Sequence, residues 1–560
     1  MSAAEFDYVV VGGGTSGAAL AARLGERADR TTCLLEAGGR DSHPFIHVPS
    51  FVAAAIHTPH LNWNFATVPQ PGMAGRPIPV PRGKVLGGSG SINGMVYFRG
   101  HPTDYDDWSD AGATGWSYAE VLPYFTRTEN NEDYPESVFH GKGGPINVKH
   151  VEGPNALNHA FMDGLASLQF PRCPDFNGAD PEGYGRRQGL MRKGRRESTS
   201  INMLRPALKQ GNVHVQTDAP VKRVLVEDGR AAGVELLDGR IVRARHEVIL
   251  CAGTVQTPQI LMLSGIGPAA HLREMDIQVV KDAPGVGGNY HDHVASPLHM
   301  ETKDSTSYGL SAKALPRDIV HLFQYLLSRT GPLAGNVFES VAFLRTDPAL
   351  TRPDVQFVFQ PAKRLTTKIP FPIGHGYAIS PVSLYPKARG TLRLASADPT
   401  AAPVIDPGLL SLPGEVDCLV RALKIARQVF ASDAFAQYGG VEVAPGPEVQ
   451  SDADIEAYIR RTGYTVHHPV GTCRMGSDKA AVVDPELRLN GIAGLRIADA
   501  SVMPSIIGGN TNAPCVMIAE RAADFILGKP ALAPANLPPE SVARYKSRPA
   551  AKSRPKKKAA

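Results

Sequence analysis

The sequence lacks closely spaced cysteines, a long apolar run and a strong excess of charge. Its six cysteines are widely separated and form no C-x-x-C pair, which favours reduced thiols in a cytosolic protein over a disulfide framework. No apolar run reaches the ~18 residues that a membrane span requires. The N-terminus has no basic stretch followed by an apolar segment, so we expect no cleaved leader. A net charge of +5 over 560 residues gives no reason to expect nucleic-acid binding.

Much of the positive charge is gathered at the C-terminus, which ends in "SRPAAKSRPKKKAA". This stretch has basic side chains, no acid and nothing large and apolar to bury, so residues 531–560 are expected to be a disordered basic tail. A weak contact with an anionic membrane surface or with nucleic acid is the alternative. We therefore expect a cytoplasmic protein, with a membrane-peripheral position as the second option.

Glycine, by contrast, is abundant and concentrated in motifs. The segment "YVVVGGGTSGAALAARLGE" reads as a buried strand, a G-x-G-x-x-G turn and a helix, and a second strand, "TTCLLE", ends in an acid. Such a turn lets a pyrophosphate approach the backbone at the helix N-terminus, while the acid hydrogen-bonds a ribose. This order of elements predicts a dinucleotide site. Its expected contacts are Gly12, Gly14, Thr15, Ser16, Gly17, Glu36 and Ala37.

Two further stretches narrow the choice of dinucleotide. Residues 82–100, "RGKVLGGSGSINGMVYFRG", are too rich in glycine for a stable helix or strand and suit a backbone wrapped around a ligand. The strand "RHEVILCAG" leads into "GTVQTPQILMLSGIG", a predicted helix with Pro258 in its first turn and glycines at its end. An acid, rather than Arg, at position 36 argues against a 2′-phosphate and so favours FAD or NAD over NADP.

These motifs resemble the glucose–methanol–choline (GMC) family of flavin oxidoreductases. The resemblance rests on "GKVLGGSGSINGMVYF", "GTVQTPQILMLSGIG", "HPVGTCRMG" and residues 495–524, and extends over about residues 5–530. Among family members, it is strongest with the bacterial alcohol and choline dehydrogenases. It implies bound FAD, a small alcohol substrate and an α/β fold, with a Rossmann-like FAD-binding domain interleaved with an α+β substrate domain that contains an antiparallel sheet.

The resemblance also implies how the chain is divided and which residues touch the cofactor. Residues 1–155, 211–297 and 463–530 would form the FAD-binding domain, and residues 156–210 and 298–462 the substrate domain. Further FAD contacts would be Gly83, Gly87, Ser89, Asn93, Gly94, Met95, Val96, Val221, Asp499, Ala500, Asn512 and Ala513. Ile92 stands where some members carry a histidine bonded to FAD, so the cofactor is expected to be non-covalent.

Alcohol oxidation needs a base near the hydroxyl, and histidine suits that role near neutral pH. By resemblance, His468 would be the base and Asn510 would hydrogen-bond the substrate oxygen. His467, its neighbour in an extended segment, would point to the opposite face. A metal site at His467, His468 and Cys473 is not expected, because structural zinc usually needs four ligands at recognisable spacing.

Several alternatives stay open. The primary reading is oxidation of a primary alcohol to the aldehyde, with hydride transfer to flavin N5. A lyase or a light-driven decarboxylase on the same scaffold, or a choline-specific dehydrogenase, would share the motifs. The electron acceptor, O₂ or a quinone-like molecule, and the oligomeric state are not determined by the sequence.

Overall fold

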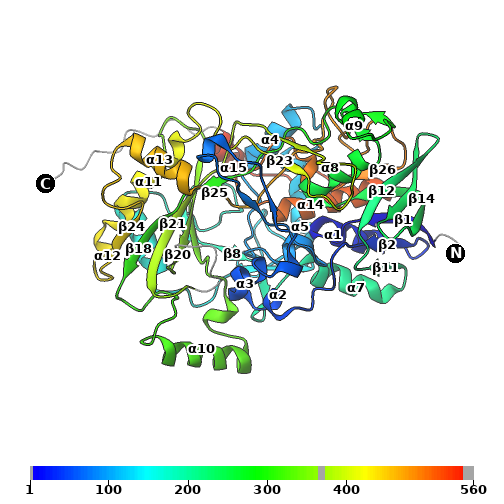
Figure 1. The fold of residues 1–560 in the computed structure, drawn as a ribbon. Helices are drawn as coiled ribbons and strands as arrows, with labels where there is room; N and C mark the ends of the chain where they lie inside the picture. The colour runs from blue at the N-terminus through cyan, green and yellow to red at the C-terminus, as the bar shows by residue number, and fades with distance from the viewer. Residues whose placement is uncertain (1–3, 364–371, 547–560) are drawn as a thin grey trace.

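The computed structural model describes residues 4–363 and 372–546. Its body holds two large sheets, one toward each end, with helices around them (Figure 1). One sheet is mainly parallel and the other antiparallel. The expected mixed α/β class with an antiparallel sheet is confirmed.

The first sheet has the strand order β11-β2-β1-β14-β13-β12, with β26 also paired to β14. Its parallel strands are β1 (Ala4–Val11), β2 (Thr32–Leu35), β11 (Val213–Gln216), β14 (Ile241–Leu250) and β26 (Leu495–Ile497). The antiparallel strands β12 (Val221–Glu227) and β13 (Arg230–Leu236) extend it at one edge. The run Val9–Val11 is buried, as a strand covered on both faces requires.

The second sheet is antiparallel, in the order β24-β18-β21-β20-β19-β7, with β17 and β25 attached beside β21. Its strands are β7 (Gly183–Arg186), β17 (Val294–Ala295), β18 (Leu298–Thr302), β19 (Ser340–Leu344), β20 (Val355–Gln360), β21 (His375–Ser383), β24 (Val441–Ala444) and β25 (Tyr464–Thr465). Small ladders join β3 (Phe65–Ala66) to β4 (Pro79–Val80), β5 (Glu129–Asn131) to β6 (Ile146–His150) and β8 (Gln188–Gly189), β9 (Met191–Arg192) to β10 (Arg195–Arg196), β15 (Ile266–Gly267) to β16 (Lys281–Asp282), and β22 (Thr391–Arg393) to β23 (Val404–Asp406).

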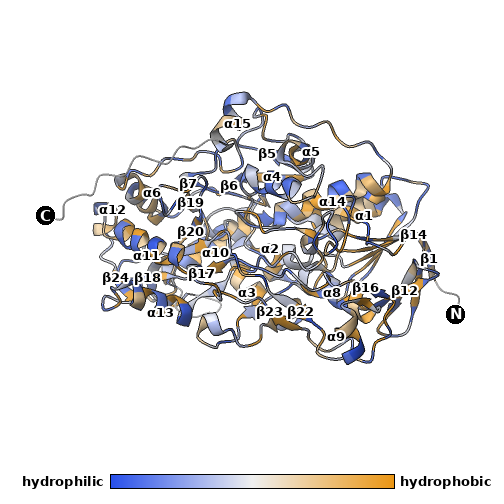
Figure 2. Ribbon diagram, turned by 90° about the horizontal axis from the view of Figure 1, so that it is seen from above, coloured by the Kyte–Doolittle hydropathy of each residue, from blue (hydrophilic) through white to orange (hydrophobic). Residues whose placement is uncertain are grey.

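The helices cover both sheets and the space between them. They are α1 (Thr15–Leu24), α2 (Pro44–His47), α3 (Val52–Ile56), α4 (Pro102–Asp110), α5 (Tyr118–Thr128), α6 (Leu157–Ser167), α7 (Arg205–Ala207), α8 (Gly253–Leu263), α9 (Ala269–Glu274), α10 (Leu315–Ser328), α11 (Asp417–Phe430), α12 (Asp433–Ala436), α13 (Asp452–Thr462), α14 (Asn512–Ile526) and α15 (Pro539–Lys546). Coloured by hydropathy, most of them mix apolar and polar residues, as helices lying on a core do (Figure 2). Among the described residues, no helix combines the length and the apolar character needed to cross a membrane.

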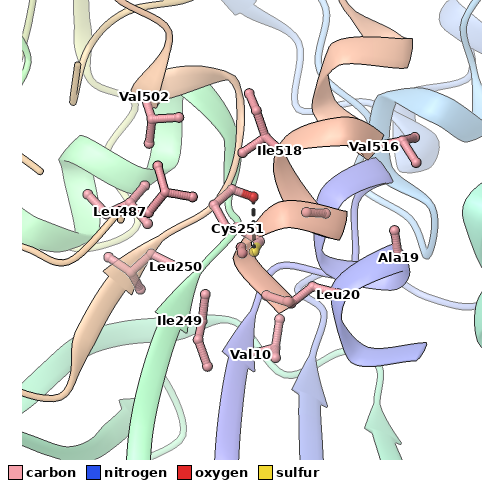
Figure 3. Close-up of a cluster of buried hydrophobic side chains, with 14 of the residues drawn as sticks. Val10, Ala19, Leu20, Ile249, Leu250, Cys251, Leu487, Val502, Val516 and Ile518 are labelled. Atoms are coloured by element: carbon pink, nitrogen blue, oxygen red, sulfur yellow. Dashed lines mark hydrogen bonds between the residues drawn. The ribbon is translucent and has the colours of Figure 1, made fainter. Parts of the chain in front are cut away.

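The core of the first sheet joins the two ends of the chain. Val10 and Ile249 of the sheet, Leu20 of α1 and Ile518 of α14 gather around Cys251 (Figure 3). The Cys251 thiol donates to the carbonyl of Ala498 at 3.3 Å. This packing brings residues 512–526 against residues 15–24, which are distant in the sequence.

Two of the expected boundaries need correction. The strands β17 and β25 fall inside the ranges 211–297 and 463–530 assigned to the cofactor domain, but both pair into the antiparallel sheet.

Helix α8 begins at Gly253, so Pro258 lies inside it rather than in its first turn. Gly265, with a φ of +79°, ends this helix as expected.

The prediction of a disordered tail over 531–560 is wrong for its first part. The Ala535 amide donates to the Ala119 carbonyl at 2.8 Å, and α15 packs its buried Tyr545 edge-on against Tyr118. Apolar residues before the basic run provide this docking, and the tail prediction took no account of them. The basic stretch 547–560 lies outside the described residues.

Candidate active site

The first glycine turn is shaped by close backbone contacts. Gly12 has a φ of +97°, which disfavours any side chain, and a Cβ on Gly17 would lie 1.9 Å from the Gly12 carbonyl oxygen. A Cβ on Gly14 would meet nothing nearer than 3.9 Å. Gly14 is also the N-cap of α1 and provides no side-chain cap. The first amides of α1, from Thr15 to Gly17, are therefore left for an anion such as a pyrophosphate.

Glu36 lies at the end of β2, next to this turn. Its carboxylate accepts hydrogen bonds from the amides of Gly13 and Gly38, each at 2.8 Å. Burial raises its pKa to about 7, although these two bonds oppose the shift. The carboxylate thus links the glycine turn to the end of the strand. Glu36 and the adjacent Ala37 are the residues predicted to lie near the ribose.

The second glycine loop folds back on itself beside the first. The Gly87 amide donates to the Gly13 carbonyl at 2.7 Å, and the Gly83 amide donates to the Ser89 hydroxyl at 3.1 Å. A Cβ on Gly83 would lie 2.3 Å from the Gly88 backbone. Only glycine fits at position 83, because the backbone of this loop folds closely against itself there.

The following turn is fixed by polar contacts. The Asn93 side-chain oxygen accepts from the Met95 amide at 2.9 Å and from Arg196 at 2.8 Å. Met95 has a left-handed backbone, with a φ of +54°, and Val96 bridges to Gly189. Asn336, shortly before β19 of the antiparallel sheet, donates to the Gly94 carbonyl. These contacts hold residues 93–96, all predicted to touch the cofactor, in one turn.

Arg196 is a buried cation at this loop. Burial lowers its pKa to about 9, and its Nη2 atom has no hydrogen-bond partner among the described residues. Its other guanidinium nitrogens contact the carbonyls of Ile46 and Gly90 and the Asn93 side chain. An orphaned buried donor is costly, and an acceptor on a bound dinucleotide would satisfy it. The polar groups around the loop thus fit FAD.

The N-terminus of α14 faces the N-terminus of α1. The Asn512 side chain donates to the Thr15 hydroxyl at 3.0 Å, and the Ser16 hydroxyl donates to the Cys515 carbonyl at 3.0 Å. Ala513 is buried in the first turn of α14. A small cavity here is lined by Thr15, Gly90, Ile146, Leu190, Glu197, Ser198, Thr199 and Asn512. Two helix dipoles, both with their positive ends here, favour a negatively charged group.

Three other predicted contacts have structural partners of their own. The Asp499 carboxylate accepts from the Gly253 amide at 2.8 Å and from the Thr257 hydroxyl at 2.6 Å, and thereby caps α8. The Ala500 carbonyl accepts from the Gly471 amide at 3.2 Å. Val221 begins β12, two residues after Ala219, whose amide donates to the Glu36 carbonyl at 2.9 Å.

His468 lies in a polar cluster that reaches from the antiparallel sheet to the turn at Gly508–Asn510. Its Nε2 lies 3.0 Å from the Asn510 side-chain nitrogen, and its Nδ1 lies 3.1 Å from Nδ1 of His293. His293 is buried, and its Nε2 lies 3.0 Å from the Leu384 carbonyl oxygen. His468 itself remains partly exposed. The predicted pair, His468 and Asn510, is therefore in direct contact.

The hydrogen bonds assign the tautomers along this chain. The Leu384 carbonyl can only accept, so His293 carries its proton on Nε2. Burial lowers the His293 pKa to about 4, so the ring is neutral and its Nδ1 accepts. Nδ1 of His468 must then be the donor. Nε2 of His468 keeps its lone pair, directed at the amide group of Asn510. A base requires this tautomer.

Burial, more than any neighbouring group, keeps the His468 ring neutral. Burial lowers its pKa well below the usual value, and His293, His467 and Arg82 add to the shift. Its backbone amide donates to the Asp292 carboxylate at 2.8 Å. Burial raises the Asp292 pKa to about 7, against the pull of Arg82. His468 is thus available as a base at neutral pH.

The predicted geometry of His467 is wrong. Its φ of +67° is left-handed, so residues 467 and 468 do not form a regular extended pair, and strand β25 ends at Thr465. Arg82 donates to the His467 carbonyl at 2.6 Å and holds this turn. Nδ1 of His467 is buried without a partner among the described residues. Cys473 is a buried free thiol, and the described chain has no cluster of metal-binding side chains.

Sequence reasoning missed His293, Asp292 and Arg82 of the His468 cluster and Arg196 at the glycine loop. The first two stand in "GVGGNYHDHV", where three titratable side chains in a row were a signal. Arg82 and Arg196 carried no such signal, because their roles depend on which backbone groups they meet.

Comparison with known proteins agrees with this geometry. The two GMC oxidoreductase family models match residues 6–295 and residues 386–519. The chain belongs to the GMC oxidoreductases. It is 40% identical over 529 residues to an alcohol dehydrogenase [acceptor] of Pseudomonas putida, covering 94% of this chain and 96% of the relative. It is 40% identical over 546 residues to an oxygen-dependent choline dehydrogenase of Rhizobium rhizogenes, covering 96% and 98%.

Solved structures show the same fold. Pyridoxine 4-oxidase from Mesorbium loti matches with a TM-score of 0.83 and 31% identity, covering 92% of this chain and 98% of that one. Formate oxidase matches with a TM-score of 0.87 and 25% identity, covering 94% and 99%. The family, the FAD cofactor and the enzyme class predicted from the sequence are confirmed.

Proposed function

We propose that this GMC oxidoreductase oxidises a primary alcohol to the aldehyde, with His468 as the general base. The observation that carries the proposal is the fixed tautomer of His468, whose Nε2 lone pair faces Asn510 in a partly exposed position. A lone pair held in this way can accept a hydroxyl proton without prior rearrangement of the ring. The Asn510 amide, 3.0 Å from this Nε2, would donate to the same oxygen.

Bound FAD supplies the acceptor, at N5, for the hydride that leaves the carbinol carbon. We propose that the parallel sheet with α1, α8 and α14 forms the Rossmann-like domain that holds it. The glycine turns, the uncapped helix N-termini and Arg196 support non-covalent binding, and Ile92 has no group that could bond to the flavin.

When Nε2 of His468 takes the proton, the ring becomes an imidazolium. Nδ1 then donates to His293 as a charged donor, which strengthens that bond. Asn510 stabilises the oxygen from which the proton departs by donating from its side-chain N–H group. The described relatives include an alcohol dehydrogenase and choline dehydrogenases at similar identity, so identity gives no preference for choline.

The test is an anaerobic screen of primary alcohols that follows flavin absorbance. We expect bleaching by an alcohol in the wild type and its loss in His468→Gln. The matched control is His299→Gln, since His299 is a buried histidine of β18 that takes no part in the His468 cluster. A flavin that stays oxidised with every alcohol while substrate is consumed would favour a lyase. Equal bleaching in His468→Gln would refute the base assignment.

A further inference from the structure

Helix α10 presents its apolar face to water. Most of its large apolar side chains are exposed, with Leu326 at 64% and Leu327 at 85% of full exposure. We use "apolar face" for the exposed residues Leu315, Ile319, Val320, Phe323, Leu326 and Leu327. An amphipathic helix on a soluble protein normally buries this stripe against the core. In α10 the apolar stripe instead faces solvent.

The polar side of α10 is what attaches it to the body. Arg317 donates to the carbonyls of Ser305 and Ser307, and the Tyr325 hydroxyl donates to the Gly194 carbonyl at 3.1 Å. Arg317, His321 and Tyr325 recur every four residues, so they share one face, and Tyr325 is the helix's buried residue. These bonds fix the rotation of α10, and the helix stands out from the body in the view of Figure 1.

Exposed cations lie at the ends of α10 and on the hairpin that anchors it. Lys313 and Arg329 flank the two ends of the helix and are exposed. The hairpin of β9 and β10, whose Gly194 receives the Tyr325 bond, adds the exposed Lys193 and Arg195. Within the described residues, none of these four has an acidic partner in an ion pair. The one acid of α10, Asp318, is paired with Arg317 on the body side.

We propose that α10 is an interfacial helix that docks the enzyme on an anionic lipid surface. Its apolar face would enter the boundary between headgroups and acyl chains, while the four cations meet lipid phosphates. A second copy of the chain is the competing occupant. A two-fold contact through this face would bring each basic rim against its own copy, and like charges there oppose association. The charge pattern therefore favours lipid.

Vesicle flotation of the full-length holoenzyme tests the proposal. We expect it to float with vesicles of phosphatidylcholine and phosphatidylglycerol, and Phe323→Asp/Leu327→Asp to remain at the bottom. Both side chains are exposed, so the variant should keep the wild-type flavin spectrum and melting temperature. The matched control is Val280→Asp, 46% exposed, immediately before β16 beside α9 (Figure 2), which should float like the wild type.

A reporter places the helix in the bilayer. In Phe323→Trp, we expect the added fluorescence to shift to the blue with these vesicles and to be quenched by lipids with brominated acyl chains. Wild-type protein that does not float overturns the proposal, as does flotation of the double aspartate variant at the wild-type level, which would assign binding to the basic C-terminus. A wild-type dimer that the same variant converts to a monomer, without flotation, would also overturn it and assign the face to a second copy.

Discussion

Replacement of His293 tests the tautomer assignment on which the proposed mechanism depends. In His293→Phe, Nδ1 of His468 loses its acceptor at 3.1 Å, and nothing then holds its proton on that atom. The ring can place the proton on Nε2 instead, where it blocks the base. We expect slower flavin reduction with little change in alcohol binding, because His293 acts through His468 and does not touch the predicted substrate position.

The size of the effect follows from the charge that develops. His468 becomes an imidazolium as it takes the proton, and a hydrogen bond from a charged donor is worth about 1.5–3 kcal/mol. Since about 1.36 kcal/mol corresponds to a factor of ten, the rate of flavin reduction should fall about 10- to 150-fold.

The assay is anaerobic stopped-flow reduction of the flavin by saturating alcohol. His293→Asn is the matched variant, because its side-chain oxygen can replace Nδ1 as the acceptor, and it should recover most of the lost rate. Melting temperatures of both variants separate the effect from general unfolding. A rate in His293→Phe within about twofold of the wild type, or equal losses in the two variants, would refute the reasoning.

Three further predictions concern the cofactor and the fold. Acid precipitation should leave the flavin in the supernatant, because Ile92 cannot bond to it; flavin in the pellet would contradict this. Gly14→Ala should fold normally but lose FAD, since its Cβ has room in the fold but occupies the phosphate position, whereas Gly17→Ala should fold poorly, its Cβ lying 1.9 Å from a carbonyl oxygen. Equal melting temperatures of the two variants, or FAD retained by Gly14→Ala, would count against this contrast. Burial lowers the pKa of His299 to about 4. Only the unfolded chain therefore binds this proton between pH ~6.5 and pH 4. The stabilising contribution is complete above pH ~6.5 and is lost as the pH falls, by about 2 kcal/mol at pH 5. In urea unfolding at pH 5 and 7, His299→Gln should lose less stability on acidification than the wild type, and an identical loss would be the contrary result.

The sequence alone determined the elements whose form follows from local chemistry. The strand Val9–Val11, the turn at Gly12 and the helix after it could be predicted, because a β-branched run and glycines at fixed spacing permit few other conformations. The family motifs likewise located His468 and Asn510, which the structure brings to 3.0 Å.

Only the tertiary structure decided what surrounds these residues. His467 adopts a left-handed backbone because Arg82, distant in sequence, holds its carbonyl, and no local pattern announces that bond. His293 selects the His468 tautomer because the Leu384 carbonyl, directly after β21, holds the His293 proton on Nε2. Helix α10 exposes its apolar face because hydrogen bonds to the β9–β10 hairpin and to nearby loops attach its other side. Motifs specify which groups are present. The long-range hydrogen bonds of the folded chain decide which atoms carry protons and which surfaces meet water.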